Sequence, residues 1–197
     1  DPAQQARIAA VPGVAELRLT RMDSLRLAPG HPPVALLARP LSPDGAGLPL
    51  VGAAVSGQGG VTIWISEAVQ DMLGWRPGDA VTLPLAGRSV PVRVAGVWRD
   101  YARQTGAVMI DLADYRRLTG DMLASDVAIF LKPDAAPAAV EAALLATAPA
   151  GALEVARPGE IRAITLRIFD RTFAVTYLLE AVAVAIGLAG VAASFAA

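Results

Sequence analysis

The sequence predicts an α+β fold followed by one long helix. Over the first 157 residues, short apolar strands alternate with short helices, and Pro and Gly mark the turns between them. From Gly159 to Ala197 there is no Pro and no turn signal, so these 39 residues are expected to form one helix. The two patterns divide the chain into a mixed α+β part and a helical C-terminal part.

The first elements predict a hairpin. Residues 4–10 are expected to end a helix, because Val11-Pro12-Gly13 follows. Residues 14–27 alternate in part between apolar and polar, which is typical of a half-buried strand, and residues 34–40 return as its partner. Six Gly and two Pro in 42–60 then predict a loop at a subdomain boundary.

A second group of strands is expected in 61–100. Residues 61–65 read as a strand, and Ser66 can cap a helix over 67–73 that ends at Gly74. The strands predicted at 80–85 and 89–98 form a hairpin, and Pro84 and Pro91 favour the edge of a sheet or a bulge.

The remaining elements alternate strand and helix up to residue 157. The predicted elements are strand 107–110, helix 112–119 capped by Asp111 and ended by Gly120, strand 126–132, helix 137–147 and strand 153–156. We therefore expect an α/β main subdomain from 1–41 and 104–157, an inserted β-rich subdomain from 61–100, and a stalk helix over 158–197. Limited proteolysis should then cut first within 42–60 or 99–106.

The two halves of the C-terminal helix differ in character. Residues 160–176 are amphipathic, whereas the seventeen residues 181–197 carry no charge. Within them, small and bulky residues fall on separate stripes: Ala185, Ala189, Ala193 and Ala197 against Val184, Leu188, Val191 and Phe195. A membrane span needs about 20 apolar residues, so we expect the start of a span in a piece of a longer polypeptide. An Ala-rich helix buried in a soluble protein or oligomer is the alternative.

Composition excludes several classes of function. There is no Cys and one His, so disulfides, zinc sites and a cysteine nucleophile are not expected. The net charge of −1 argues against a nucleic-acid partner. His31 lies in a Pro-rich turn with Ser42 in a flexible loop, and Lys132 precedes a Pro turn, so neither a triad nor a Ser-Lys dyad is expected.

Other polar and aromatic residues have simpler structural roles. The pairs Asp111/Asp114 and Asp121/Asp126 sit at expected helix ends, where they act as caps or solvated charges before acid–base groups. Gly57-Gln58-Gly59-Gly60 lacks the Lys of a phosphate-binding loop and is expected to be a hinge. Trp75 is expected to cap a small core rather than to bind a partner. No catalytic, cofactor or metal site is predicted, and the substrate-binding residues are unknown.

Two stretches carry a family resemblance. The segment IRAITLRIFDRTFAVTYLLEAVAVAIGLAGVAASFAA (161–197) resembles the entry into a transmembrane helix of FtsX-like ABC-transporter permeases. ISEAVQDMLGWRPGDAVTL (65–83) followed by RSVPVRVAGVWRDYARQTGAVMIDLADYRRLTG (88–120) is similar to the MacB-type periplasmic core domain of these permeases. The order of the motifs carries the resemblance, which covers 61–197; residues 1–60 follow by context.

The resemblance implies a non-catalytic role without a cofactor. Such permeases work with a cytoplasmic ATPase and a second permease copy or a homologous subunit, and act on lipoproteins, lipids or periplasmic proteins. It implies that the chain lies in the bacterial inner membrane with residues 1–175 periplasmic, although Arg162, Arg167 and Arg171 would favour the cytoplasm for that flank. A membrane-anchored binding or scaffold module without transport is the alternative, and a soluble enzyme with an Ala-rich oligomerisation helix is a third.

Overall fold

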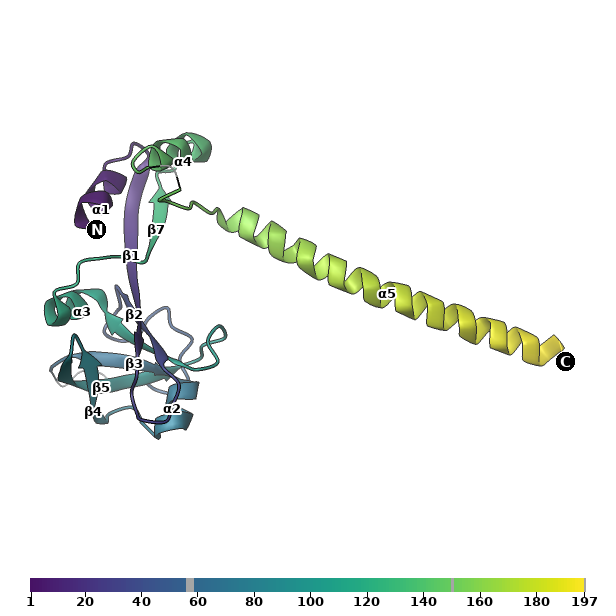
Figure 1. The fold of residues 1–197 in the computed structure, drawn as a ribbon, viewed down its shortest axis with the longest axis horizontal. Coiled ribbons are helices and arrows are strands. Elements are labelled where there is room, and N and C mark those ends of the chain that lie inside the picture. Colours follow the sequence, from purple (N-terminus) through teal and green to yellow (C-terminus); the bar gives the residue numbers. More distant parts are fainter. Residues whose placement is uncertain (56–58, 150, 197) are drawn as a thin grey trace. The chain divides into compact units, whose positions relative to one another are not determined.

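The structure is a computed structural model that describes residues 1–55, 59–149 and 151–196. It divides into two compact units, Asp1–Ala148 and Pro149–Ala197, and each is described by itself. Unit 1 holds all seven strands and four helices of the described residues, and unit 2 is dominated by one long helix (Figure 1). The predicted α+β class followed by a long apolar helix is confirmed.

The elements alternate along the chain much as the sequence predicts. In order they are α1 (Pro2–Ala9), β1 (Val14–Leu25), β2 (Val34–Arg39), β3 (Thr62–Ser66), α2 (Glu67–Leu73), β4 (Ala80–Leu85), β5 (Arg88–Trp98), β6 (Ala107–Asp111), α3 (Leu112–Thr119), β7 (Asp126–Leu131), α4 (Pro137–Leu145) and α5 (Pro158–Ala196).

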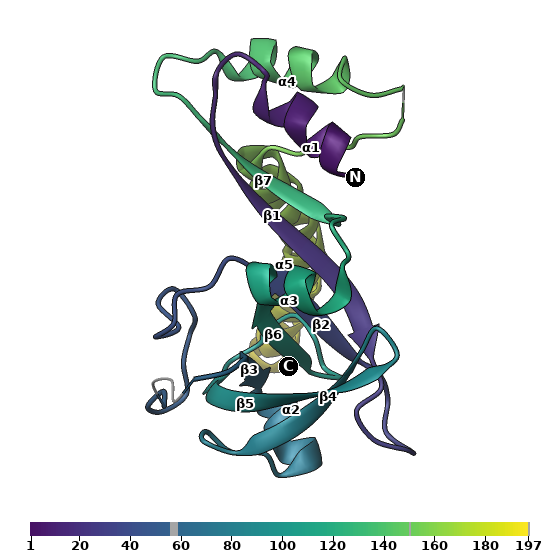
Figure 2. The same cartoon turned by 90° about the vertical axis from the view of Figure 1, so that its left-hand side faces the viewer.

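Unit 1 is built on one mixed sheet of seven strands in the order β4-β5-β3-β6-β2-β1-β7. The predicted hairpins β1–β2 and β4–β5 are antiparallel, whereas β2–β6 and β3–β5 are parallel. Pro84 lies in β4 at the edge of the sheet, where a missing N–H removes no ladder hydrogen bond from a further strand. Helices α1 and α4 lie side by side near one end of β1 and β7, and the Gln4 amide donates to Thr147 Oγ1 at 2.9 Å (Figure 2).

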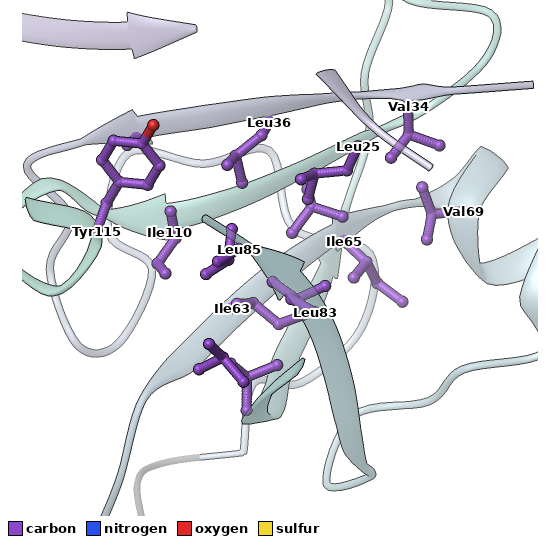
Figure 3. Packing of buried hydrophobic residues seen from close by; sticks show 14 of the residues in the cluster. Leu25, Val34, Leu36, Ile63, Ile65, Val69, Leu83, Leu85, Ile110 and Tyr115 are labelled. Atoms are coloured by element: carbon purple, nitrogen blue, oxygen red, sulfur yellow. The ribbon is translucent and has the colours of Figure 1, made fainter. Parts of the chain in front are cut away.

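The larger core covers one face of the sheet. It gathers Leu36 of β2, Ile63 and Ile65 of β3, Val69 of α2 and Tyr115 of α3, among others, and these side chains point toward one another (Figure 3). Burying each aliphatic side chain contributes about 1.5–3 kcal/mol, so this face supplies much of the stability of unit 1. The core draws on strands from 1–41 and from 61–100, so the two predicted subdomains share one sheet; their division stays a prediction.

The opposite face carries a smaller core around Trp64. The Trp64 ring lies so close to Gly45 and Gly96 that a Cβ on either glycine would come within 2.4 Å and 2.6 Å of ring atoms. Four apolar residues pack over this face: Leu41, which precedes the predicted loop 42–60, and Leu48, Leu50 and Ala54 within that loop. The segment from Leu41 to Ala54 therefore covers the sheet, and the close contacts of Trp64 depend on glycine at Gly45 in the loop and at Gly96 in β5.

The predicted starts and ends of α2 and α3 are confirmed, and one predicted strand is wrong. Ser66 Oγ accepts from the Val69 N–H and caps α2, and Asp111 caps α3; Gly74 and Gly120 end these helices in the left-handed conformation. Residues 153–156 form no strand, because their backbone meets no free strand edge within unit 2. The helix predicted over 137–147 ends at Leu145.

Candidate functional site

The apolar part of α5 is the first candidate functional feature. Thr176–Phe195 is the one segment of the described residues that is long and apolar enough to cross a membrane, with a mean hydropathy of 2.1. Its 20 residues extend about 30 Å as a helix, which equals the thickness of a bilayer's hydrocarbon core. None of this segment is buried inside the protein. Its apolar side chains can therefore contact an apolar environment such as lipid.

The helix is continuous over 39 residues, Pro158–Ala196, or about 58 Å (Figure 1). Leu188 and Ile186 are exposed. The Ser194 hydroxyl donates a hydrogen bond to the Gly190 carbonyl oxygen at 2.9 Å, so this hydroxyl is satisfied without water. The amphipathic faces predicted for 160–176 concern side chains that, apart from Phe173 and Thr176, lie outside the described residues. The helix is unbroken between its two halves.

The residues weighed for catalysis are not brought together. His31 is exposed in its turn, where Nδ1 lies 3.3 Å from the Pro29 carbonyl oxygen, and Ser42 is exposed in the following loop. Lys132 is exposed beyond β7. Asp111 caps α3, and Asp114 lies in the first turn of α3 and pairs with Arg117. Among the described residues no three His, Cys, Asp or Glu side chains form a group that could hold a metal ion.

One charged cluster links α3, β1 and the loop before β7. The Arg21 guanidinium pairs with Asp121 at 2.7 Å, and the Tyr115 hydroxyl donates to the same carboxylate at 3.2 Å. The Leu123 N–H and then Arg21 hold the pKa of Asp121 below its ordinary value, while burial raises the pKa of Tyr115. The sequence predicts a cap or a solvated charge at Asp121, because its partner Arg21 on β1 is a hundred residues away and leaves no local signal.

The connector Arg99–Arg103 is more ordered than a solvated crossing. The Arg99 guanidinium donates to both carboxylate oxygens of Glu67, at 2.8 and 3.1 Å, which lowers the pKa of Glu67. The Asp100 side chain is only 4% exposed and pairs with Arg103 at 3.2 Å. Tyr101, between them, is 84% exposed. The connector thus fixes its backbone with ion pairs and presents one aromatic ring to solvent.

The three tryptophans all pack against one of the two cores. Trp64 and Trp98 are buried in the smaller core, and Trp75 packs, half-buried, against the larger core. Trp75 therefore caps a core, as predicted. The Trp98 indole differs in one respect: its Nε1 is buried and has no hydrogen-bond partner among the described residues.

Two solved structures are similar to part of this chain. One is the extracellular domain of the noncanonic ABC-type transporter YknZ from Gram-positive bacteria, with a TM-score of 0.48 and 14% identity over 72% of this chain and 76% of that one. The other is the periplasmic region of MacB from Actinobacillus actinomycetemcomitans, with a TM-score of 0.49 and 15% identity over 74% of this chain and 71% of that one. No protein-family model and no curated protein matches the chain. The chain's own residues therefore carry the functional proposal.

Proposed function

We propose that unit 1 is an extracytoplasmic domain of an ABC-transporter permease subunit. We further propose that the apolar part of α5 enters the cell membrane and anchors unit 1 there. The observation that carries the proposal is the 20-residue apolar segment Thr176–Phe195, fully unburied and continuous with the helix that begins at Pro158. The order of the motifs in 65–83 and 88–120, which resembles that of MacB-type permeases, supports the assignment to this class.

The role proposed for the domain is mechanical and not catalytic. A partner ATPase in the cytoplasm would drive motion, and the domain would act on a lipoprotein, a lipid or another hydrophobic cargo in the periplasm. An α-helix suits this task because each turn is hydrogen-bonded to the next, so that displacement at one end is passed to the other. The absence of Pro between Gly159 and Ala197 supports such a stiff connection.

We also propose that residues 1–157 form two subdomains, 1–41 with 104–157 and an inserted 61–100. The loop over 42–60 and the connector 99–106 join them, and β3 and β6 pair across the boundary over three residue pairs, Ile63 to Ile65 with Val108 to Ile110. Brief proteolysis of the folded chain tests this division: first cuts elsewhere in unit 1 would contradict it.

Co-purification tests the central part of the proposal. The full-length parent protein, extracted in detergent, should retain an ATPase subunit that carries a Gly-Lys-Ser/Thr loop. Recovery of the membrane-bound parent without any ATPase would instead support an anchored binding or scaffold module without transport.

A matched pair of variants tests the stiff connection. Ala181→Pro breaks the α5 ladder at an exposed position, whereas Ala181→Leu keeps it. Both variants should keep the ATPase, but Ala181→Pro alone should lose the ATP-dependent change in the protease sensitivity of unit 1. An ATP-dependent change that persists in Ala181→Pro would contradict the proposed transmission through α5.

A further inference from the structure

A cavity of about 410 Å³ opens on the face of the sheet that carries the smaller core. Strands β1, β2 and β6 supply its floor, and the loop after β2 supplies one wall. Its apolar lining consists of Met22, Leu37, Leu48, Pro49, Trp98 and Met109. The volume is typical of sites for small molecules, and the two methionines can adjust their shape to a ligand.

One cation at this cavity has no partner among the described residues. Arg39 ends β2, is partly buried, and makes no hydrogen bond or ion pair with any described residue. Its cross-strand neighbour, Asp111, is already committed: that carboxylate accepts from the N–H groups of Leu41 at 3.1 Å and of Ala113 at 2.9 Å. A guanidinium presents its donors in a fixed fork that matches a carboxylate, so Arg39 lacks the acceptor its geometry fits.

The Trp98 ring belongs to the apolar lining of the cavity. Trp98 is 6% exposed, and its buried Nε1 has no partner among the described residues, so the ring can report on a bound ligand without offering a donor at the cavity surface. The cavity therefore combines an apolar lining with one guanidinium that has no partner among the described residues.

The other charges at the cavity limit the kind of anion it can accept. Arg103 is neutralised by Asp100 at 3.2 Å. Asp126 of β7, two strands from Arg39 in the sheet, also lines the cavity and has no ion-pair partner among the described residues. Its negative charge opposes a dianion such as a phosphate monoester more strongly than a single carboxylate.

We propose that this cavity binds a small amphiphile with an apolar body and one carboxylate, the chemistry of a medium-chain fatty acid. The carboxylate pairs with Arg39, and the hydrocarbon lies on the apolar lining, which includes the Trp98 ring. The site belongs to unit 1 alone, so the proposal does not require α5 to cross a membrane or an ATPase to bind.

Octanoate is the probe that tests the site, with the 197-residue chain held in phosphatidylcholine nanodiscs and empty nanodiscs as the blank. The chain has three tryptophans, so the indole N–H resonance of Trp98 can be assigned with Trp98→Phe and followed by NMR during titration. We expect a saturable shift of that resonance, with the Trp64 and Trp75 resonances moving less. Octanol should bind at least fivefold more weakly, because it lacks the carboxylate.

Two charge variants give the sharpest control, because they are expected to change the affinity for octanoate in opposite directions. Arg39→Gln should weaken octanoate binding at least fivefold, and Asp126→Asn should tighten it about twofold or more. The proposal fails if Trp98 does not respond, if Arg39→Gln binds as tightly as the wild type, or if Asp126→Asn does not tighten binding. Tighter binding of octyl phosphate than of octanoate would overturn the carboxylate assignment. These outcomes are independent of whether an ATPase co-purifies.

Discussion

Unit 1 and helix α5 use apolar residues in opposite ways. In the sheet of unit 1 a core of large apolar side chains points inward, and Ile63, Ile65 and Val94 have no measurable exposure. In α5 they point outward, and Ile186 and Leu188 are about two-thirds exposed. Water therefore stabilises the fold of unit 1, whereas it opposes the exposed segment of α5. The difference indicates that the two units are adapted to two solvents.

The largest expected effect comes from the smaller core. Trp64→Ala removes a ring that is 2% exposed and should lower the free energy of unfolding of unit 1 by about 3–5 kcal/mol. Thermal unfolding followed by near-UV circular dichroism measures this. The matched control, Leu179→Ala in α5, removes an exposed side chain and should change the stability of unit 1 by less than about 0.5 kcal/mol. Equal effects would erase the contrast between the two units.

Charge at the centre of the apolar segment should have the next largest effect. Ile186→Arg places a cation near the middle of Thr176–Phe195 and should oppose membrane insertion by about 2.5–3.5 kcal/mol. Tyr177→Arg, near the start of that segment, can extend its charge to the interface and should be tolerated. Flotation of membranes after carbonate extraction compares the two. If Ile186→Arg floated as well as Tyr177→Arg, α5 would not be a membrane span.

The glycine beside Trp64 sharpens the comparison further. Gly96→Ala would put a Cβ 2.6 Å from a Trp64 ring atom and should destabilise unit 1 by about 1–3 kcal/mol. Gly187→Ala, in α5, meets nothing within 4 Å and should leave unit 1 unchanged. Chemical denaturation of both variants provides the measurement. A neutral Gly96→Ala would mean that the face carrying Trp64 is loosely packed.

The smallest effect is the pH dependence of the Arg21–Asp121 pair. Because the folded pKa of Asp121 lies below its unfolded value of about 3.9, its stabilisation is present above that value and is lost as pH falls through the folded pKa. At pH 7, Asp121→Asn should cost about 1 kcal/mol in the free energy of unfolding. The difference between Asp121→Asn and the wild type should shrink below about pH 4. A difference that stayed constant down to pH 2 would show that the charge contributes nothing.

Local signals predicted most of the fold. Ser66 and Asp111 marked helix starts, Gly74 and Gly120 marked helix ends, and alternation placed β1 and β7; each signal acts within a few residues of the element it sets. The strand predicted at 153–156 is wrong because a strand also needs a partner edge, and the pattern LEVA carries no information about one.

The cavity could not be predicted from the sequence, because the residues that line it are distant along the chain. Arg39 reads as the polar end of a strand, Trp98 as the buried end of another, and Asp126 as the start of a third. The sheet order, which places β1 between β2 and β7, brings Arg39 and Asp126 to the same part of the sheet. Trp98 comes from β5, on the other side of β3 and β6, and lines the same cavity. The lack of a partner for Arg39 among the described residues becomes visible only when every nearby acceptor has been assigned.

The placement of the two units across a membrane is open to one direct measurement. The chain has no Cys, so single cysteines at Tyr101, which is 84% exposed, and at Ile186 can be labelled without background. Intact spheroplasts expressing each variant are treated with a membrane-impermeant maleimide. The account predicts that Tyr101→Cys is labelled in intact spheroplasts and that Ile186→Cys is labelled only after solubilisation and unfolding. Labelling of Tyr101→Cys only after lysis, or of Ile186→Cys in intact membranes, would contradict it.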